Sequence, residues 1–344
     1  MTRPKATVSL IQTLMTLGVG VLGAVVGWAL SAPVFMLLGP AVAVSLAGLG
    51  GLKVNINTRL RDVCFVVLGL AVGTGFDADA LAAMVRWPLA FVVMALVLWA
   101  ILQTCRALLV RVFGFERRAA LLAGAPGHLS FVIAFASDID ADVARISITQ
   151  SVRLLSLTIV VPFIAVALGV DVGGNIAPQG DPILPVSLVL LTLVAIGVGV
   201  IFVRLGVPAP LLMAAMVISG VAHLTGWVPG VLPDWMVLPA YLVLGALIGT
   251  RFSGLTFSDL RLGLAAGLSV TGVAVLFAAL GAVPLAWVLG MPIAHILVAF
   301  APGGLETMIA MGVVLGVVPG FVAACHIARL LVLTVLLPAM LGRK

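Results

Sequence analysis

Residues Ala299–Leu341 read AFAPGGLETMIAMGVVLGVVPGFVAACHIARLLVLTVLLPAML, and residues Ala123–Ala165 read AGAPGHLSFVIAFASDIDADVARISITQSVRLLSLTIVVPFIA. The two stretches align without a gap at an offset of 176 residues, the distance from Ala123 to Ala299. Three motifs coincide in this alignment: Ala-Pro-Gly at 125–127 and 301–303, Arg-Leu-Leu at 153–155 and 329–331, and a proline at 162 and 338. Because similarity at a constant offset marks a duplicated architecture, we expect two repeats, residues 1–175 and 176–344, packed into one unit.

The composition predicts a protein that resides in a lipid bilayer. Hydrophobic residues make up 63% of the 344 residues, charged residues only 9%, and the mean hydropathy is +1.34. A soluble chain carries roughly a quarter charged residues. The net charge of +6 comes from basic residues that stand singly or in pairs between apolar runs, which is the pattern of the positive-inside bias. We therefore expect an integral membrane protein with the lipid bilayer, and no nucleic acid, as a partner.

Twelve apolar runs, separated by Gly, Pro and charged residues, follow one another along the chain. They cover residues 9–31, 33–50, 62–76, 88–110, 119–136 and 146–168 in the first half, and 184–204, 208–226, 236–250, 262–283, 290–312 and 319–341 in the second. Runs of this length and apolarity predict an all-α polytopic membrane protein. The first run is too long for a cleaved signal peptide, so we expect it to be a membrane span.

The charges of the loops favour two repeats of opposite orientation. Loops 51–61 and 111–118 carry several Lys and Arg residues, whereas their counterparts 227–236 and 284–290 carry none, and loops 77–87 and 251–261 show the reverse bias. With five spans and one re-entrant run in each half, all eighteen Lys and Arg residues except Arg86, Arg153 and Arg329 lie in the cytoplasm or at its membrane face. A twelve-span arrangement leaves several outside, namely Arg86, Arg145, Arg204, Arg251 and Arg261. The positive-inside rule thus predicts inverted repeats, about ten spanning helices plus two broken re-entrant segments, and cytoplasmic N- and C-termini.

A proline and a glycine interrupt the fifth run of each half, at Pro126-Gly127 and at Pro302-Gly303. Proline cannot donate the helical hydrogen bond and glycine relaxes the backbone, so each run is expected to form two half-helices around a tip. Inverted repeats with interrupted helices are typical of secondary transporters, whose site lies where the two breaks meet. An ordinary kinked span is the alternative.

Arg153 and Arg329 are the most informative polar residues because each lies about two turns inside an apolar run. A charge at that depth costs at least about 2.5–3.5 kcal/mol, so it needs a partner or a function. Gln150 and His326 precede the arginines by three residues, which places each pair on adjacent faces of one helix. With Thr158 and Thr334 further along, each run has a polar side that we expect to face inward. The arginines either bind an anionic group such as a carboxylate, brace the carbonyls of the broken segment, or, for Arg329, pair with Glu306.

Glu306 is the only acid well inside an apolar run, and it could bind a coupling H⁺ or Na⁺ or serve as the partner of Arg329. Its counterpart in the first repeat is Ser130, so the halves differ chemically. His128 on the first tip and His326 on the last run could titrate near neutral pH. The candidate substrate-binding set combines the tips with the polar faces of the two arginine runs: Pro126, Gly127, His128, Gln150, Arg153, Pro302, Gly303, Gly304, Glu306, His326 and Arg329.

Metal-ligand and nucleotide motifs are missing from the sequence. Four scattered histidines form no HxxxH or HxxE pattern, and the three cysteines form no CxxC pair. There is also no GxxxxGK[ST] phosphate loop. We therefore expect no metal, no cofactor and no enzymatic activity.

The duplicated Pro-Gly tip, the Arg-Leu-Leu motif and the closing proline resemble the AbrB-duplication family of bacterial integral membrane proteins, and the resemblance covers essentially the whole chain. Members are commonly labelled ammonia monooxygenase or AbrB-family regulator of gene expression. The residues fit neither label literally, because clustered ligands for copper or iron and a soluble basic DNA-binding module are lacking in the sequence.

The interpretation that best fits the sequence is a secondary transporter or permease of the bacterial inner membrane that moves a small organic anion. In this interpretation the ligand is a small molecule such as a carboxylate, and transport alternates access around the two Pro-Gly breaks. A membrane sensor that regulates gene expression through a partner is the main alternative, and a membrane monooxygenase is the third. The sequence leaves open whether the protein forms a homo-oligomer.

Overall fold

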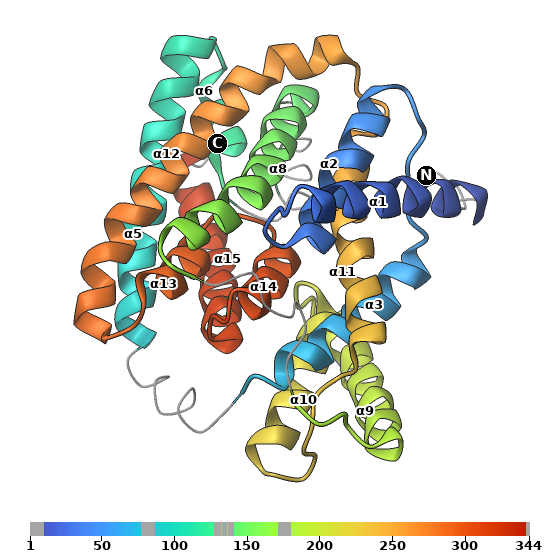
Figure 1. The fold of residues 1–344 in the computed structure, drawn as a ribbon. Helices are drawn as coiled ribbons and strands as arrows, with labels where there is room; N and C mark the ends of the chain where they lie inside the picture. Colours follow the sequence, from blue (N-terminus) through green and yellow to red (C-terminus); the bar gives the residue numbers. More distant parts are fainter. Residues whose placement is uncertain are drawn as a thin grey trace.

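The computed structural model describes residues 10–76, 87–126, 132, 136, 141–170 and 180–341, with residues 257–259, 262 and 319 described by their backbone alone. Within these residues the chain is all α-helical apart from one isolated bridge, and Figure 1 shows the helices packed side by side. Seven helices are long and apolar enough to cross a membrane. The protein is therefore an all-α polytopic membrane protein, as its hydropathy predicts.

The first half contributes α1 (Leu10–Ala29), α2 (Phe35–Leu49), α3 (Thr58–Gly73), α5 (Trp87–Phe113), α6 (Arg117–Gly124) and α8 (Val143–Ala167). The second half contributes α9 (Pro185–Arg204), α10 (Pro210–Leu224), α11 (Asp234–Gly249), the 3₁₀ turn η2 (Thr250–Phe252), α12 (Phe257–Leu289), α13 (Ile293–Phe300), α14 (Leu305–Val314) and α15 (Pro319–Leu341).

Helices of the two halves correspond in order and in position. α6 and α13 begin at Arg117 and Ile293, 176 residues apart, and α8 and α15 begin at Val143 and Pro319, again 176 apart. The packing partners correspond too: α3 packs on α10 as α2 packs on α11, and α8 packs on α12 as α15 packs on α5. Most contacts therefore join a helix of one half to a helix of the other.

Two glycines explain how closely these helices approach each other. A Cβ atom on Gly69 of α3 would collide with the Leu212 carbonyl of α10, and one on Gly245 of α11 would collide with the Leu37 carbonyl of α2. Small residues at such crossings let helix backbones touch, which is how helices associate in a membrane. The backbone contacts at these crossings exclude any side chain larger than hydrogen.

The contacts divide the helices into two groups, each drawn from both halves. α1, α2, α3, α9, α10 and α11 form one group, which we call the panel. α5, α6, α8, α12, α13, α14 and α15 form the other, which we call the bundle. Contacts between the groups are sparser than contacts within them and involve chiefly α2, α3 and α11 of the panel and α8, α14 and α15 of the bundle.

Several expected boundaries are wrong by a few residues, for local reasons. α3 begins at Thr58 and α8 at Val143, four and three residues earlier than expected, because Asn57 and Asp142 cap them by accepting hydrogen bonds from backbone N–H groups. The expected loop 284–290 is mostly helix, since α12 continues through Pro284 to Leu289. A proline inside a membrane helix is tolerated where neighbouring groups satisfy the freed carbonyl.

Candidate functional site

The first break follows α6, which ends at Gly124 against the middle of α8. Arg153 Nη1 donates to the carbonyl oxygens of Ala125 at 3.0 Å and Gly124 at 3.4 Å, and its Nη2 donates to Gln150 Oε1 at 2.9 Å. Gln150 Nε2 in turn donates to the carbonyls of Leu122 at 2.8 Å and Ala125 at 3.0 Å. Pro126 is buried beside them, whereas Gly127 and His128 lie outside the described residues.

The second break separates α13 from α14, as the proline and glycine of this run predict. α13 ends at Phe300, Ala301 caps it, and α14 begins at Leu305 with Gly304 as its N-cap residue. The intervening Pro302 and Gly303 are buried, and the Gly303 N–H donates to the Ala301 carbonyl at 2.8 Å. Arg329 of α15 forms hydrogen bonds with the backbone of this turn.

Arg329 Nη1 donates to the Ala301 carbonyl and Nη2 to the Gly303 carbonyl, both at 3.0 Å. His326 differs from Gln150, because its Nδ1 pairs at 2.9 Å with the Val322 carbonyl of its own helix. The His326 Nε2 is buried without a hydrogen-bond partner. The second break is thus held by one side chain where the first is held by two.

These hydrogen bonds agree with the alternative in which the two arginines brace the backbone carbonyls of the broken segments. Arg153 and Arg329 are 1% and 3% exposed, and each places a positive charge at the C-terminal end of a half-helix, where the helix dipole favours a cation. Arg329 forms no ion pair with Glu306, so the proposed pairing of these two residues is wrong. Direct contact of either arginine with a ligand stays a prediction.

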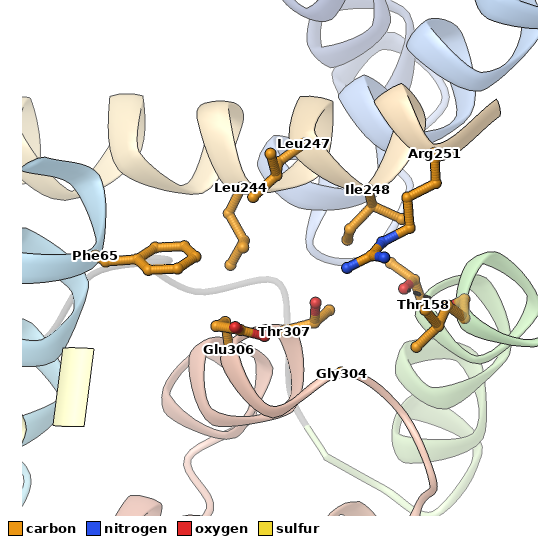
Figure 2. Close-up of a pocket in the computed structure, with 10 residues that line it drawn as sticks. Phe65, Thr158, Leu244, Leu247, Ile248, Arg251, Gly304, Glu306 and Thr307 are labelled. Carbon is orange, nitrogen blue, oxygen red and sulfur yellow. Dashed lines mark hydrogen bonds between the residues drawn. The ribbon is translucent and has the colours of Figure 1, made fainter. Parts of the chain in front are cut away.

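A pocket opens at the start of α14, between the panel and the bundle (Figure 2). Its cavity volume is about 30 Å³, room for about one water molecule, so an organic ligand would fit only after the walls move apart. Its walls come from α3, α8, α11, η2 and the α14 start: Phe65, Leu154, Thr158, Leu244, Leu247, Ile248, Arg251, Gly304, Glu306 and Thr307. Of the predicted site residues that the structure describes, Gly304 and Glu306 line this pocket.

Arg251 and Glu306 reach into the pocket from opposite walls (Figure 2). Arg251 extends from η2 and is exposed, and Glu306 lies half-buried in the first turn of α14. Within the described part of the chain, neither side chain has a hydrogen bond or a close ion pair, although the two opposite charges line the same pocket. A mostly apolar pocket with one free guanidinium and one free carboxylate suits an organic ion once its walls have moved apart.

Arg251 is a functional candidate that the sequence analysis missed, because it was assigned to the cytoplasmic loop 251–261. The repeat held a signal that could have found it. Arg251 aligns with Gly75 and Glu306 aligns with Ser130, so both charges lack a counterpart in the first half. Two unmatched opposite charges in a duplicated protein suggest a shared site.

The threonines of the two arginine helices differ in exposure. Thr158 of α8 is buried and lines the pocket, with its hydroxyl donating to the Leu154 carbonyl at 2.8 Å. Thr334 of α15 is exposed, so the expectation that it faces inward is wrong. The Thr307 hydroxyl lies near the N-cap Gly304, at the end of α14 where free backbone N–H groups favour an anion.

Ligands for a metal do not gather in the part of the chain described above: no three His, Cys, Asp or Glu side chains come together there. The three cysteines are buried and unpaired, in keeping with a packing role.

Comparison with known proteins gives the family. The family model described as "Transition state regulatory protein AbrB" matches residues 36–343. "Putative regulator AbrB" of Escherichia coli (strain K12) is 23% identical over 228 residues, which span 64% of this chain and 64% of that protein. "Uncharacterized protein YhjN" of Bacillus subtilis (strain 168) is 25% identical over 302 residues, which span 83% of this chain and 78% of that protein. Since the family model covers nearly the whole chain, this protein belongs to the AbrB family.

Proposed function

We propose that this protein is a secondary transporter of the bacterial inner membrane that carries a small organic anion. The observation that carries the proposal is the pocket between panel and bundle, where the guanidinium of Arg251 is free of any hydrogen bond or close ion pair among the described residues. Free guanidinium groups recognise carboxylates by paired hydrogen bonds.

The pocket walls favour a particular kind of anion. Among the described lining side chains, Arg251 is the one basic residue and most of the others are apolar, with Phe65 presenting its ring (Figure 2). A single guanidinium matches a single carboxylate, and the apolar walls match a hydrocarbon or aromatic body. We therefore propose a monocarboxylate with an apolar body as the substrate class.

Alternating access would arise from movement of the panel against the bundle. The pocket lies at their junction, and the two crossings at Gly69 and Gly245, where a glycine faces a backbone carbonyl, lie within the panel. An inverted relation of the repeats is supported by Figure 1, where α5 rises to α6 at the top of the view and α12 descends from the top to α13. In transporters built from inverted repeats, one unit rocks against the other around a central site.

The braces fit this proposal as devices that keep broken helices rigid. Arg153 and Arg329 fix the carbonyls that end the first half-helices, so α14 can present its N-terminal end to the pocket without unfolding. A coupling H⁺ or Na⁺ would act at Glu306. The re-entrant course of the broken segments, the cytoplasmic location of both termini and any homo-oligomer belong to the same proposal.

Uptake of [¹⁴C]benzoate into proteoliposomes tests this function, because benzoate combines one carboxylate with an apolar ring. We expect saturable uptake by the wild type and loss of uptake in Arg251→Gln. Arg111→Gln is the matched control, since Arg111 is an exposed arginine at the end of α5, away from the pocket. Equal uptake by wild type and Arg251→Gln would contradict the proposed site.

A membrane sensor that regulates gene expression is the second candidate, and it rests on the word "regulator" in the names of the family and of the Escherichia coli relative. The two functions differ in whether the ligand crosses the membrane. A sensor would bind benzoate or a related carboxylate, shown by a rise in apparent stability, while uptake into proteoliposomes stayed at background.

A further inference from the structure

We propose that Glu306 acts as a proton-operated counter-ion of Arg251: its carboxylate competes with the substrate for the guanidinium, and protonation of Glu306 frees Arg251 to bind the anion. This inference rests on the proposed anion site and specifies how that site would couple to a proton. The carboxylate takes up one proton from solvent, and no other bond forms or breaks.

The geometry places the two charges where they must influence each other. Arg251 and Glu306 line the same small pocket from opposite walls (Figure 2). They are not locked together, because no ion pair joins them. An anion that enters the pocket approaches a guanidinium and a carboxylate at once. Repulsion by the carboxylate opposes binding, and the apolar walls strengthen that repulsion by lowering the local dielectric.

Four other ionisable groups on the helices around the pocket have partners. On α3, Arg61 pairs with Asp62 at 2.7 Å, and on α11, the Tyr241 hydroxyl donates to the Ala310 carbonyl at 3.3 Å. On α8 and α15, Arg153 and Arg329 are bound to backbone carbonyls. His326 of α15, which packs on α14, is fully buried and does not line the pocket. Among the described residues that line the pocket, Glu306 is the one acid.

The same arrangement favours a proton over a sodium ion at Glu306. A sodium ion would bring a second positive charge beside Arg251 and needs several oxygen ligands. Apart from Glu306, the lining side chains offer only the hydroxyls of Thr158 and Thr307, and Thr158 already donates to Leu154. A proton neutralises the carboxylate without adding a bulky cation.

The repeat provides a natural reference for the inference. The first half has Ser130 where the second has Glu306, and Gly75 where the second has Arg251. A counter-ion and its cation are expected to be present together or absent together, and both are absent from the first half. Glu306→Ser therefore installs the residue that the other repeat already uses.

The test is calorimetric titration of the purified full-length protein in nanodiscs with benzoate, between about pH 5.5 and pH 8, where benzoate stays ionised. We expect the affinity of the wild type to fall as pH rises, by up to about tenfold per pH unit, because anion and proton binding are reciprocally linked. Binding should take up protons, seen as a dependence of the heat on the buffer. Replacing sodium by choline should change nothing.

The variants separate the outcomes. Glu306→Gln and Glu306→Ser should bind benzoate with high affinity at every pH and without proton uptake, and Arg251→Gln should not bind at any pH. If wild-type binding is independent of pH, or if Glu306→Gln keeps the pH dependence, the proton mechanism is overturned while the anion site stands. If sodium rather than pH sets the affinity, Glu306 is a sodium ligand and the inference fails. If the folded wild type binds no benzoate at any pH, both the proposed monocarboxylate site and the proton mechanism are refuted.

Discussion

The two broken segments end their first half-helices in the same way and differ in chemistry. In both, the half-helix ends just before an Ala-Pro pair, and an arginine binds the carbonyls there. The first break is also held by Gln150, which bonds the Leu122 and Ala125 carbonyls, whereas His326 at the equivalent position turns away to its own helix. Only the second segment carries an acid, Glu306, at the start of its second half-helix.

This difference distinguishes supporting residues from the residues of the proposed site within one duplicated chain. Positions that match between the halves, such as Arg153 with Arg329 and Gly69 with Gly245, satisfy buried carbonyls or let helices touch. Positions that do not match, Arg251 and Glu306, meet in the pocket. In the proposed site, these two unmatched charges would bind the anion and the proton.

The largest expected effect is all-or-none and tests whether the halves are inverted. A cysteine at Pro229, in the loop between α10 and α11, should react with an impermeant maleimide added to whole cells, and a cysteine at Lys53 should react only after lysis. The native cysteines are buried and should give a low background. Labelling of both sites from the same side would refute the inverted arrangement.

Loss of an arginine brace should have the next largest effect, and the two halves should differ. Arg153→Met leaves the two bonds of Gln150 to the α6 carbonyls, whereas Arg329→Met leaves no such bond from α15 to the second break. Since a buried polar group without a partner costs about 1–3 kcal/mol, we expect Arg329→Met to lower the free energy of unfolding by about that much more than Arg153→Met. Unfolding in detergent with guanidinium or urea measures both, and equal losses would mean that Gln150 contributes no support.

The glycine crossings should respond equally, because both face a backbone carbonyl. Gly69→Ala and Gly245→Ala should each lower the free energy of unfolding by about 1–3 kcal/mol through overpacking. Gly272→Ala on α12 is the matched control, since its added Cβ meets no atom within 4 Å and alanine favours the helix. A large effect at only one crossing would show that the two crossings, although alike in their contacts, differ in how much they stabilise the panel.

The smallest effect should come from making the second break resemble the first. In His326→Gln the new amide can reach the carbonyls of α13, as Gln150 reaches those of α6, and the unpaired Nε2 is removed. We expect a gain of about 0.5–1.5 kcal/mol, the usual net value of a hydrogen bond. The same substitution should recover part of the loss in Arg329→Met. Thermal unfolding in one detergent compares the wild type, His326→Gln, Arg329→Met and the double variant. A double variant no more stable than Arg329→Met would contradict this account.

The sequence predicted the helices well because apolar length is a direct requirement of the bilayer. The run 319–341 coincides with α15, and the break at Pro302-Gly303 separates two helices as proline and glycine require. The helix starts at Thr58 and Val143 depend on single capping bonds, which hydropathy does not register.

Tertiary packing accounts for what the sequence could not predict. The division into panel and bundle pairs helices of different halves, and no periodicity encodes which helix of one half meets which helix of the other. Arg251 was counted among the loop charges because it follows an apolar run, and only the fold turns its side chain toward Glu306. The roles of Gly127 and His128 stay predictions, because both lie outside the described residues.

The arginine braces also have a consequence for how the chain is made. The carbonyls at 124–125 and at 301–303 are synthesised 28 or 29 and 26 or 28 residues before the arginines that bind them. When Arg153 or Arg329 leaves the ribosome, its acceptors have therefore already emerged. A guanidinium that enters hydrocarbon without a partner is costly. An arginine that binds the half-helix made before it can instead leave the translocon together with that half-helix, as a hairpin whose charge already has its hydrogen bonds. The order of synthesis would thereby let each repeat insert its own buried charge without help from the other.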